Sequence, residues 1–373
     1  MSRIFLILIF IRPFISSLAY PYLNSVYSAS LIGCLVIFFL NKRNALKNIQ
    51  VLNYPVMLFL SALIISIVSS PDRIKSLNEF YNYVSGLLML LFVSSLSYED
   101  RTRVLRTVLL SAFVISLLAI YQYLFGFQHL LNYIAKAKVN DVFALEYIQR
   151  KRVFFPFITP NTLAGYLIMI IPLALINKNR IWFILPLSFA LLLTKSLGAF
   201  FSIFLALTIY FCLNGGLKKR VVFFLSAILL IIVLVFIARS ASQKEHLHPL
   251  FSTMTRLNYW KQTLEIFKRN PISGVGIGNF DLMQSRFAHN SYLQIGAEMG
   301  AFGIIGFIWI IFVSFKIGLH KRKAQIDKMY ISGLLAANAA FLIHNFVDFS
   351  FFLAEVSLVW WLILGLIAAK DSG

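Results

Sequence analysis

The stretch "RVVFFLSAILLIIVLVFIA", residues 220–238, is almost continuously apolar and decides the class of this protein. A transmembrane helix needs about 20 consecutive, mostly apolar residues, and this run has that length. The turn that leads into it, "GLKKR" at 216–220, is basic, which is typical of the cytoplasmic end of a span. The run therefore predicts a helix that leaves the cytoplasm and opens into the polar segment after it.

Similar apolar runs recur along the whole chain. It has 373 residues, of which 60% are hydrophobic and 13% are charged. Soluble globular proteins have about 25% charged residues, so this composition excludes that class. We expect an all-α polytopic membrane protein with a single integral membrane domain over 1–373. The approximate limits of the twelve predicted spans are 4–23, 25–41, 51–70, 80–97, 104–124, 160–177, 181–194, 197–214, 220–238, 300–317, 329–347 and 350–369.

The short basic turns predict how the chain is oriented. With the N-terminus in the cytoplasm, five turns rich in Lys or Arg fall on the inside, which follows the positive-inside rule. An even number of spans returns the C-terminus to the cytoplasm. The apolar N-terminus has no small-residue cleavage site after it, so we expect a retained first span. The five turns are "NKRNALKN" (41–48), "YEDRTRVLR" (98–106), "NKNR" (177–180), "GLKKR" (216–220) and "LHKRKAQIDK" (319–328).

Two long polar segments then lie outside, a smaller loop at 125–159 and a large loop at 239–299. The formal net charge of the chain is +20, and both loops are basic although they lie on the outer side. In a soluble protein this charge would indicate nucleic acid, but here it indicates an anionic partner at the outer membrane surface. The alternative is that single basic residues only contact the phosphates of membrane lipids.

The large loop contains a predicted amphipathic helix at 253–270, "TMTRLNYWKQTLEIFKRN". Leu257, Trp260, Leu264 and Phe267 recur at spacings of three and four, which predicts one apolar face. Arg256 lies four residues before Trp260, so the two side chains share a side of the helix. Pro271 ends the helix. The simplest interpretation is a helix that lies flat at the membrane surface, with Arg256 extended towards the headgroups.

A glycine-rich turn and a histidine follow this helix. Gly274, Gly276 and Gly278 in "PISGVGIGNF" (271–280) predict a tight turn whose backbone amides either bind an anion or only shape a loop. His289 and Asn290 in "FAHNSYLQIGAEMG" (287–300) stand just before the chain re-enters the membrane. A lone histidine is more often structural than catalytic, but this position suits a group that exchanges protons.

The order of these motifs resembles the O-antigen ligase and O-antigen polymerase superfamily of bacterial membrane glycosyltransferases. The large loop gives Arg-x-x-x-Trp, Pro-x-x-Gly-x-Gly-x-Gly-x-Phe, His-Asn-x-Tyr-Leu and Glu-x-Gly in sequence before a span. The resemblance covers about residue 150 to the C-terminus, and its combined order is more specific than any single motif. Three further segments are similar to the family, "PNTLAGYLIMIIPLAL" (160–175), "TKSLGAFFSIFLAL" (194–207) and "HNFVDFSFFLAEVSLVWWLILGL" (344–366).

The resemblance implies a GT-C-like fold of about twelve spans, with a helical periplasmic loop between spans nine and ten. It implies an enzyme of the bacterial inner membrane whose active site faces the periplasm. The donor would be a glycan on undecaprenyl pyrophosphate, and the acceptor a hydroxyl of the lipid A-core oligosaccharide. The polyprenyl tail of this donor needs a groove open to lipid, which we expect among spans six to eight.

The chemistry requires a cation for the departing pyrophosphate and a base for the attacking hydroxyl. Arginine binds phosphate oxygens in a bidentate manner, so we assign Arg256 to the pyrophosphate. The family often has Arg after the Ser of Thr-x-Ser, but this chain has Leu197 there. Lys195, Arg150 and Arg152 are therefore the further predicted cations of the donor site.

His289 is the predicted general base, because an unperturbed imidazole titrates near neutral pH. Asn290, Tyr292, Trp260 and Asp348 are predicted to support the site. Asp348 lies at the junction of the last two spans, where an ionisable residue is a functional candidate. The alternative is that Asp348 only caps the hairpin by pairing with an outer-loop cation.

We expect no metal and no other cofactor. The chain has no Asp-x-Asp pair of the type that holds a divalent ion on phosphates, so cationic side chains would replace the metal. A Glu245-x-x-His248 metal site is a minor alternative.

The motifs do not separate three activities that share this donor. These are an O-antigen ligase, an O-antigen polymerase and an O-linked oligosaccharyltransferase with a protein acceptor, and the modest length of the 239–299 loop favours the ligase. The alternative outside the enzymes is a polysaccharide flippase or transporter. A transporter predicts charged residues and broken helices at the membrane midplane with inverted repeats, and no such internal symmetry is evident.

Overall fold

The computed structural model describes residues 3–41, 50–137, 142–177, 179–240, 249–324 and 327–370. Within these ranges the regular structure is helical, apart from one isolated bridge between Leu282 and Ser285. The predicted all-α class is therefore confirmed. Helices suit a lipid environment because each satisfies its own backbone hydrogen bonds.

Every predicted span overlaps a helix of the described chain. Four stretches are long and apolar enough to cross a membrane, Pro21–Asn41, Tyr98–Lys136, Lys219–Ala238 and Ser291–Lys323, and five shorter helices are also apolar. The exact number of spans stays a prediction. The helices that correspond to the predicted spans are α1 (Arg3–Ile11), α2 (Pro21–Asn41), α3 (Gln50–Val68), α4 (Arg73–Ser94), α5 (Tyr98–Tyr121), α8 (Pro160–Leu175), α9 (Arg180–Thr194), α10 (Leu197–Leu213), α11 (Lys219–Ser240), α13 (Ser291–Lys323), α14 (Lys328–His344) and α15 (Ala354–Ala368).

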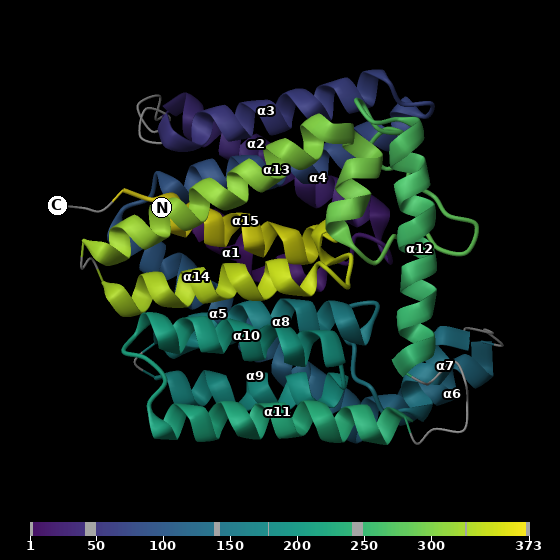
Figure 1. The fold of residues 1–373 in the computed structure, drawn as a ribbon, viewed down its shortest axis with the longest axis vertical. Helices are drawn as coiled ribbons and strands as arrows, with labels where there is room; N and C mark the ends of the chain where they lie inside the picture. The colour runs from purple at the N-terminus through teal and green to yellow at the C-terminus, as the bar shows by residue number, and fades with distance from the viewer. Residues whose placement is uncertain are drawn as a thin grey trace.

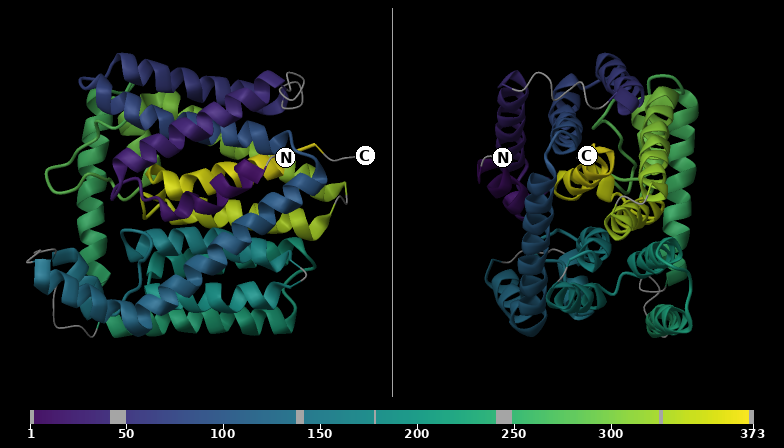
Figure 2. Two further views of the ribbon diagram at one scale, coloured as in Figure 1. Left: turned by 180° about the vertical axis from the view of Figure 1, so that it is seen from behind. Right: turned by 90° about the vertical axis from the view of Figure 1, so that its left-hand side faces the viewer.

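Three helices lie outside this set. They are α6 (Phe127–Ala137) and α7 (Val142–Gln149) in the smaller polar loop, and α12 (Pro249–Arg269) in the large one. The spans run roughly alongside one another, and α12 runs across their ends, with α6 and α7 at the same end of the bundle (Figure 1). The view from behind also shows α12 across that end, while α1 begins and α15 ends towards the opposite end (Figure 2, left). This arrangement puts the two long polar segments on one side of the bundle.

The predicted first span, 4–23, is not one continuous helix. α1 ends at Ile11, a short 3-10 turn covers Arg12–Phe14, and the next helix begins at Pro21. Pro13 cannot continue the α-helical hydrogen bonding, which explains the break. The buried Arg12 side chain donates to the carbonyl oxygen of Ala354 at 3.2 Å and to Asn24 Oδ1 at 2.7 Å. Through these hydrogen bonds, Arg12 joins the N-terminal segment of the chain to the start of the last helix.

The predicted fourth span, 80–97, also needs correction. α4 begins at Arg73, because the Asp72 side chain caps it by accepting from the amides of Ile74 and Lys75. Such caps satisfy amides that otherwise lack a partner at the start of a helix. The first part of α4 is polar, so the apolar run alone did not predict that the helix begins there.

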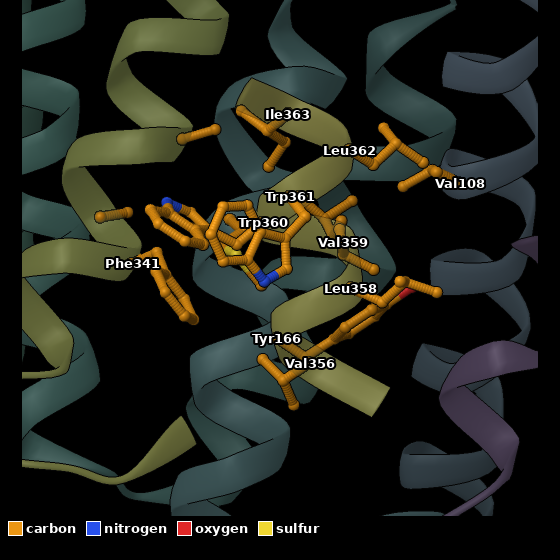
Figure 3. Close-up of a cluster of buried hydrophobic side chains, with 14 of the residues drawn as sticks. Val108, Tyr166, Phe341, Val356, Leu358, Val359, Trp360, Trp361, Leu362 and Ile363 are labelled. Carbon is orange, nitrogen blue, oxygen red and sulfur yellow. The ribbon is translucent and has the colours of Figure 1, made fainter. Parts of the chain in front are cut away.

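The core is built around α15, which is buried along almost its whole length. Trp360 and Trp361 fill its centre, and side chains from α5, α8 and α14 surround it (Figure 3). The indole Nε1 of Trp360 donates to Asn338 Oδ1 at 2.8 Å, and the ring stacks on Phe341. This packing fixes the end of α14 and the start of α15, which lie beside each other near α12.

α13 is kinked at Gly300, where φ is 67° and ψ is −165°. Only glycine adopts this region of backbone conformation without strain. A Cβ at this position would lie 2.0 Å from the carbonyl oxygen of Ile272. The kink therefore separates a first segment, which packs on α12, from the span that starts near the predicted residue 300.

We expect Gly300→Ala to lower the thermal unfolding midpoint in detergent. The new methyl group would clash with backbone and hold a disfavoured φ, a cost of about 1–3 kcal/mol. Gly33→Ala in α2 is the matched control, because a Cβ there meets nothing within 4 Å. The control should leave the midpoint unchanged or slightly higher, since Ala favours a helix by up to about 1 kcal/mol. Equal midpoints for Gly300→Ala and wild type would contradict this account of the kink.

Candidate active site

The helix predicted at 253–270 is present as α12, and its predicted apolar face is not the face that packs on the protein. Leu257 and Leu264 are each 42% exposed, so they do not belong to the packed face. The helix instead packs through Tyr259 and Ile266 on a small cluster that includes Phe280 and Ala288. Two of the four predicted apolar positions thus remain available to solvent or lipid headgroups, while the aromatic Tyr259 faces the protein.

The glycine-rich turn does not present free amides. Gly274, Gly276 and Gly278 all have positive φ, as the turn prediction required. Their amides donate to protein acceptors, with Gly276 bound to the carbonyl oxygen of Glu298 and Gly278 to its side chain. A Cβ at Gly274 would lie 2.2 Å from the backbone of Glu298. The turn therefore locks the large loop onto the start of α13, and the anion-binding alternative is wrong.

His289 lies where this loop meets α13. Its φ of 51° is in the left-handed region, and its neighbours on both sides are fixed by hydrogen bonds. Ala288 donates its amide to Gln294 Oε1 at 3.0 Å, and Asn290 caps α13 by accepting from the amide of Leu293 at 3.1 Å. The strained backbone is held by these bonds, so the imidazole has a defined direction.

Two aromatic rings enclose the imidazole of His289. Tyr259 stacks on it at 6.0 Å with an interplanar angle of 19°, and Phe349 meets it edge-on at 4.9 Å. The buried Nδ1 of His289 has no hydrogen-bond partner. The two ring contacts therefore hold the imidazole in place, and Nδ1 is not used in a hydrogen bond within the described chain.

The loop between α14 and α15 is tied directly to the segment beside His289. Ser291 donates its amide to the carbonyl oxygen of Asn345 at 2.9 Å and its hydroxyl to Asn345 Oδ1 at 2.6 Å. The same hydroxyl lies 3.1 Å from the carbonyl oxygen of Asp348. These bonds bring the last predicted hairpin to the histidine, although the two segments are more than fifty residues apart in sequence.

Asp348 is fully buried at this junction. Its Oδ2 accepts from the hydroxyl of Ser350 and lies 3.4 Å from His344 Nε2, while its Oδ1 has no hydrogen-bond partner. Burial by itself raises the pKa of this carboxyl group, but His344, Ser350 and His289 outweigh it and lower the pKa to about 2. The group is therefore a carboxylate at neutral pH.

Arg256 lies close to both of these groups. Burial lowers the pKa of its guanidinium, and the charge of Asp348 opposes that shift. Burial, followed by the positive charge of Arg256, lowers the pKa of His289 to about 4, against the opposing effect of Asp348. At neutral pH the site thus combines one cation, one carboxylate and one neutral imidazole that can accept a proton. The structure brings the predicted Arg256, His289 and Asp348 together.

A cavity of about 470 Å³ opens beside Arg256. Its wall is otherwise apolar except for Ser202, so the guanidinium is the one charged group among the lining residues. It lies between α10, α11 and α14. Of the expected spans six to eight, only the eighth, α10, contributes lining residues to it. The lining residues are Leu197, Gly198, Phe201, Ser202, Ile232, Phe236, Arg256, Ile343, Phe346 and Val347.

The other predicted cations gather at the start of α10. Lys195 Nζ donates to the carbonyl oxygen of Arg150 at 2.8 Å, and Arg150 pairs with Glu146 at 2.8 Å. Arg152 donates to the carbonyl oxygen of Thr194 and to Asn161 Oδ1. Burial lowers the pKa of Lys195, and the positive charge of Arg152 adds to this effect. These charges have protein partners, and of the three only Lys195 is close in sequence to Leu197, which lines the cavity.

Hydrogen bonds join the motifs of this region. Asn161 Oδ1, which accepts from Arg152, also accepts from the Ser196 hydroxyl at 3.0 Å. The segments "PNTLAGY" and "TKSLGA" therefore meet at one corner. Their separation in sequence gave no indication of this contact, because neither contains a local pattern that predicts it.

The remaining predicted residues have identifiable roles in packing. The Tyr292 hydroxyl donates to the carbonyl oxygen of Leu342 at 2.9 Å, and its ring stacks on Phe346 of the cavity wall. Trp260 is half-buried on α12, and its Nε1 has no hydrogen-bond partner. Tyr259 and Phe349 were not predicted as site residues. Tyr259 lies three residues after Arg256, and hence on the same side of the helix, which is the signal that could have indicated it.

The possible metal site at Glu245 and His248 lies outside the described residues. Across the part of the chain that the structure describes, no group of three or more His, Cys, Asp or Glu side chains is arranged to hold a metal ion.

Comparison with known proteins supports the resemblance found in the sequence. Residues 181–308 match the family model for O-antigen ligase. The matched segment runs from α9 into α13 and contains Lys195, Arg256 and His289, while Arg150, Arg152 and Asp348 lie outside it. No curated protein matches the chain.

We expect Ser291→Ala to destabilise the protein by about 0.5–1.5 kcal/mol, because it removes a buried hydrogen bond to Asn345 Oδ1, which keeps only the amide of Phe351 as a donor. The thermal unfolding midpoint in detergent measures the effect. The control is Ser25→Ala, which removes only a bond to Pro21 within its own helix and should change stability by less than about 0.5 kcal/mol. Equal effects of the two substitutions would show that the Ser291 contacts do not fix the junction.

Proposed function

We propose that this chain, whose residues 181–308 match the family model for O-antigen ligase, is a membrane glycosyltransferase with a polyprenyl-linked donor. It moves an O-antigen glycan from undecaprenyl pyrophosphate to a hydroxyl of the lipid A-core oligosaccharide. The observation that carries the proposal is the position of Arg256, a cation on the wall of an apolar cavity and within electrostatic reach of His289.

The cavity suits an amphiphilic donor. Phosphate oxygens favour a guanidinium, because they bind its fork of donors in a bidentate manner. A polyprenyl chain requires an apolar path that is open to lipid. α11 supplies one side of the cavity through Ile232 and Phe236, and very little of this helix is buried in the protein. A tail in this cavity would therefore leave into the bilayer while its pyrophosphate stays near Arg256.

The proposed reaction is a single displacement at the anomeric carbon. An acceptor hydroxyl attacks that carbon, and its proton passes to His289. The new bond joins the acceptor oxygen to the sugar, and the bond from the sugar to the pyrophosphate oxygen breaks. Its electron pair leaves with undecaprenyl pyrophosphate, which is stabilised by Arg256. One displacement inverts the configuration of the anomeric carbon.

The supporting residues act by holding these two groups. Asn290 and Tyr292 fix the segment that carries His289, and Tyr259 and Phe349 enclose its ring. Trp260 lies one turn from Arg256 on α12. We assign Lys195, Arg150 and Arg152 to the outer part of the donor site, where their combined charge favours an approaching pyrophosphate.

The proposed location is the bacterial inner membrane. The end of the bundle that carries α12 would face the periplasm, and both termini would lie in the cytoplasm, as the basic turns predict. Lipid A-core is the proposed acceptor, while another lipid-linked glycan or a protein hydroxyl would use the same donor site. An acceptor series in the assay below distinguishes these three.

The direct test is glycan transfer by the purified protein from a polyprenyl-pyrophosphate glycan to lipid A-core. We expect His289→Ala to lower kcat by roughly 10²–10⁴-fold, because the attacking hydroxyl loses its base. Arg256→Ala should lower kcat by about 10²–10³-fold through lost stabilisation of the leaving group. Mass spectrometry of the product also gives the acceptor.

Two variants are matched controls for this assay. His129→Ala removes an exposed histidine of α6, and Arg103→Ala removes an exposed arginine in the first turns of α5. Both should transfer at the wild-type rate. Transfer that survives His289→Ala would refute the assignment of the base, and a wild-type protein that moves lipid-linked glycan without transferring it would indicate a flippase.

We expect the wild-type rate to be the same when a chelator of divalent cations is present. The arginine would supply the positive charge that a metal provides in other enzymes of this general type. Restoration of a lost rate by added Mg²⁺ or Mn²⁺ would contradict metal independence.

A further inference from the structure

The side chain of Asp348 makes more interactions than it would need if it only capped the hairpin between α14 and α15. Its Oδ2 is held by the hydroxyl of Ser350 and by His344, while its Oδ1 is buried without a hydrogen-bond partner. A buried carboxylate with an unsatisfied oxygen is costly, so its persistence indicates a use in function. The loop is already fixed by Ser291, which binds the backbone of Asp348 and the side chain of Asn345.

The protein makes room for His344 between two neighbouring helices. A Cβ on Gly165 of α8 would lie 3.0 Å from the His344 ring, and a Cβ on Gly198 of α10 would lie 3.7 Å from it. Neither ring nitrogen of His344 has a hydrogen-bond partner within the described chain, and its Nε2 lies 3.4 Å from Asp348 Oδ2. Two close-packed helices thus hold a histidine against the carboxylate.

Asp348 also acts electrostatically on both main groups of the site. Its negative charge opposes the effects that lower the pKa values of Arg256 and His289. The charged or titratable groups that face it are His344 from α14, His289 from the loop before α13 and Arg256 from α12. The geometry agrees, because the backbone of Asp348 lies 3.1 Å from the Ser291 hydroxyl and the ring of the next residue, Phe349, meets the His289 ring at 4.9 Å. The carboxylate therefore lies at the same junction as the proposed base.

We propose that Asp348, held by His344 and Ser350, is a positioning residue that stabilises the positive charge of His289 after it accepts the acceptor's proton. This inference rests on the proposed function. Before the reaction His289 is neutral, and the carboxylate is held by Ser350 and His344. When pyrophosphate oxygens bind Arg256 and the hydroxyl proton reaches His289, the negative charge of the Asp348 carboxylate compensates the new imidazolium. Asp348 does not itself take the proton.

The test is Asp348→Asn, which keeps the size of the side chain and removes its charge. In the transfer assay we expect kcat to fall about tenfold or more. The apparent KM for the donor should not rise, because the substitution removes a negative charge close to the pyrophosphate. The acid limb of the kcat/KM profile should move to lower pH, because loss of the Asp348 charge lowers the pKa of His289. Asp281→Asn, in an exposed part of the same outer surface, is the control and should leave all three quantities unchanged.

Ser350→Ala is a second variant in case Asp348→Asn does not fold. It removes a hydrogen-bond donor to Oδ2 and should reduce kcat in the same direction by a smaller factor. An Asp348→Asn protein with wild-type kcat and an unmoved acid limb would overturn the inference. A purely structural role would lower the unfolding midpoint and leave the pH profile of the folded fraction unchanged.

A second measurement separates this inference from the proposed function. Histidine NMR titration of the purified protein without donor should place the His289 pKa lower in Asp348→Asn than in wild type. If wild type transfers no glycan but this shift occurs, the proposed function fails and the electrostatic coupling stands. If wild type transfers glycan and the shift is absent, the inference fails alone.

Discussion

The site depends on a single electrostatic constraint, a guanidinium held on the wall of an otherwise apolar cavity. Charges buried among apolar side chains are costly unless a counter-charge lies close by. Asp348 is that counter-charge for Arg256, and it is in turn held by His344 and Ser350. The same cation helps to keep His289 neutral, which is the state a base needs. The pKa values of Arg256 and His289 therefore depend on the charges around them as well as on burial.

The scaffold fixes this arrangement by joining distant parts of the chain. The glycine-rich turn binds the backbone of Glu298 and so ties the large loop to α13. Ser291 joins the start of α13 to the hairpin that contains Asp348, and α12 covers both with Tyr259 stacked on His289. In each connection a small or polar residue lets backbone segments approach closely. The buried side chains around α15, which follows the hairpin, pack closely with those of α5, α8 and α14 (Figure 3).

The sequence was sufficient for the helical class, and each predicted span overlaps a helix, because long apolar runs have few structural alternatives in a membrane. It failed where local polar groups decide the outcome. Arg12 and Pro13 break the first helix, and Asp72 starts α4 earlier than its apolar run. The order of the motifs predicted Arg256, His289 and Asp348 as site residues. Their convergence could not be predicted, because it depends on tertiary contacts between α12, α13 and the last hairpin. No local spacing indicated the stacking of Tyr259, the place of His344 beside Asp348, or the capture of the glycine-turn amides by Glu298.

The most direct test is an experimental structure of the protein with a polyprenyl pyrophosphate bound. The account predicts that the pyrophosphate contacts Arg256, that the tail lies between α10, α11 and α14, and that His289 faces the carbon that would carry the glycan. A tail bound elsewhere, or a pyrophosphate held away from Arg256, would contradict the central claim that one cavity unites the donor cation and the base.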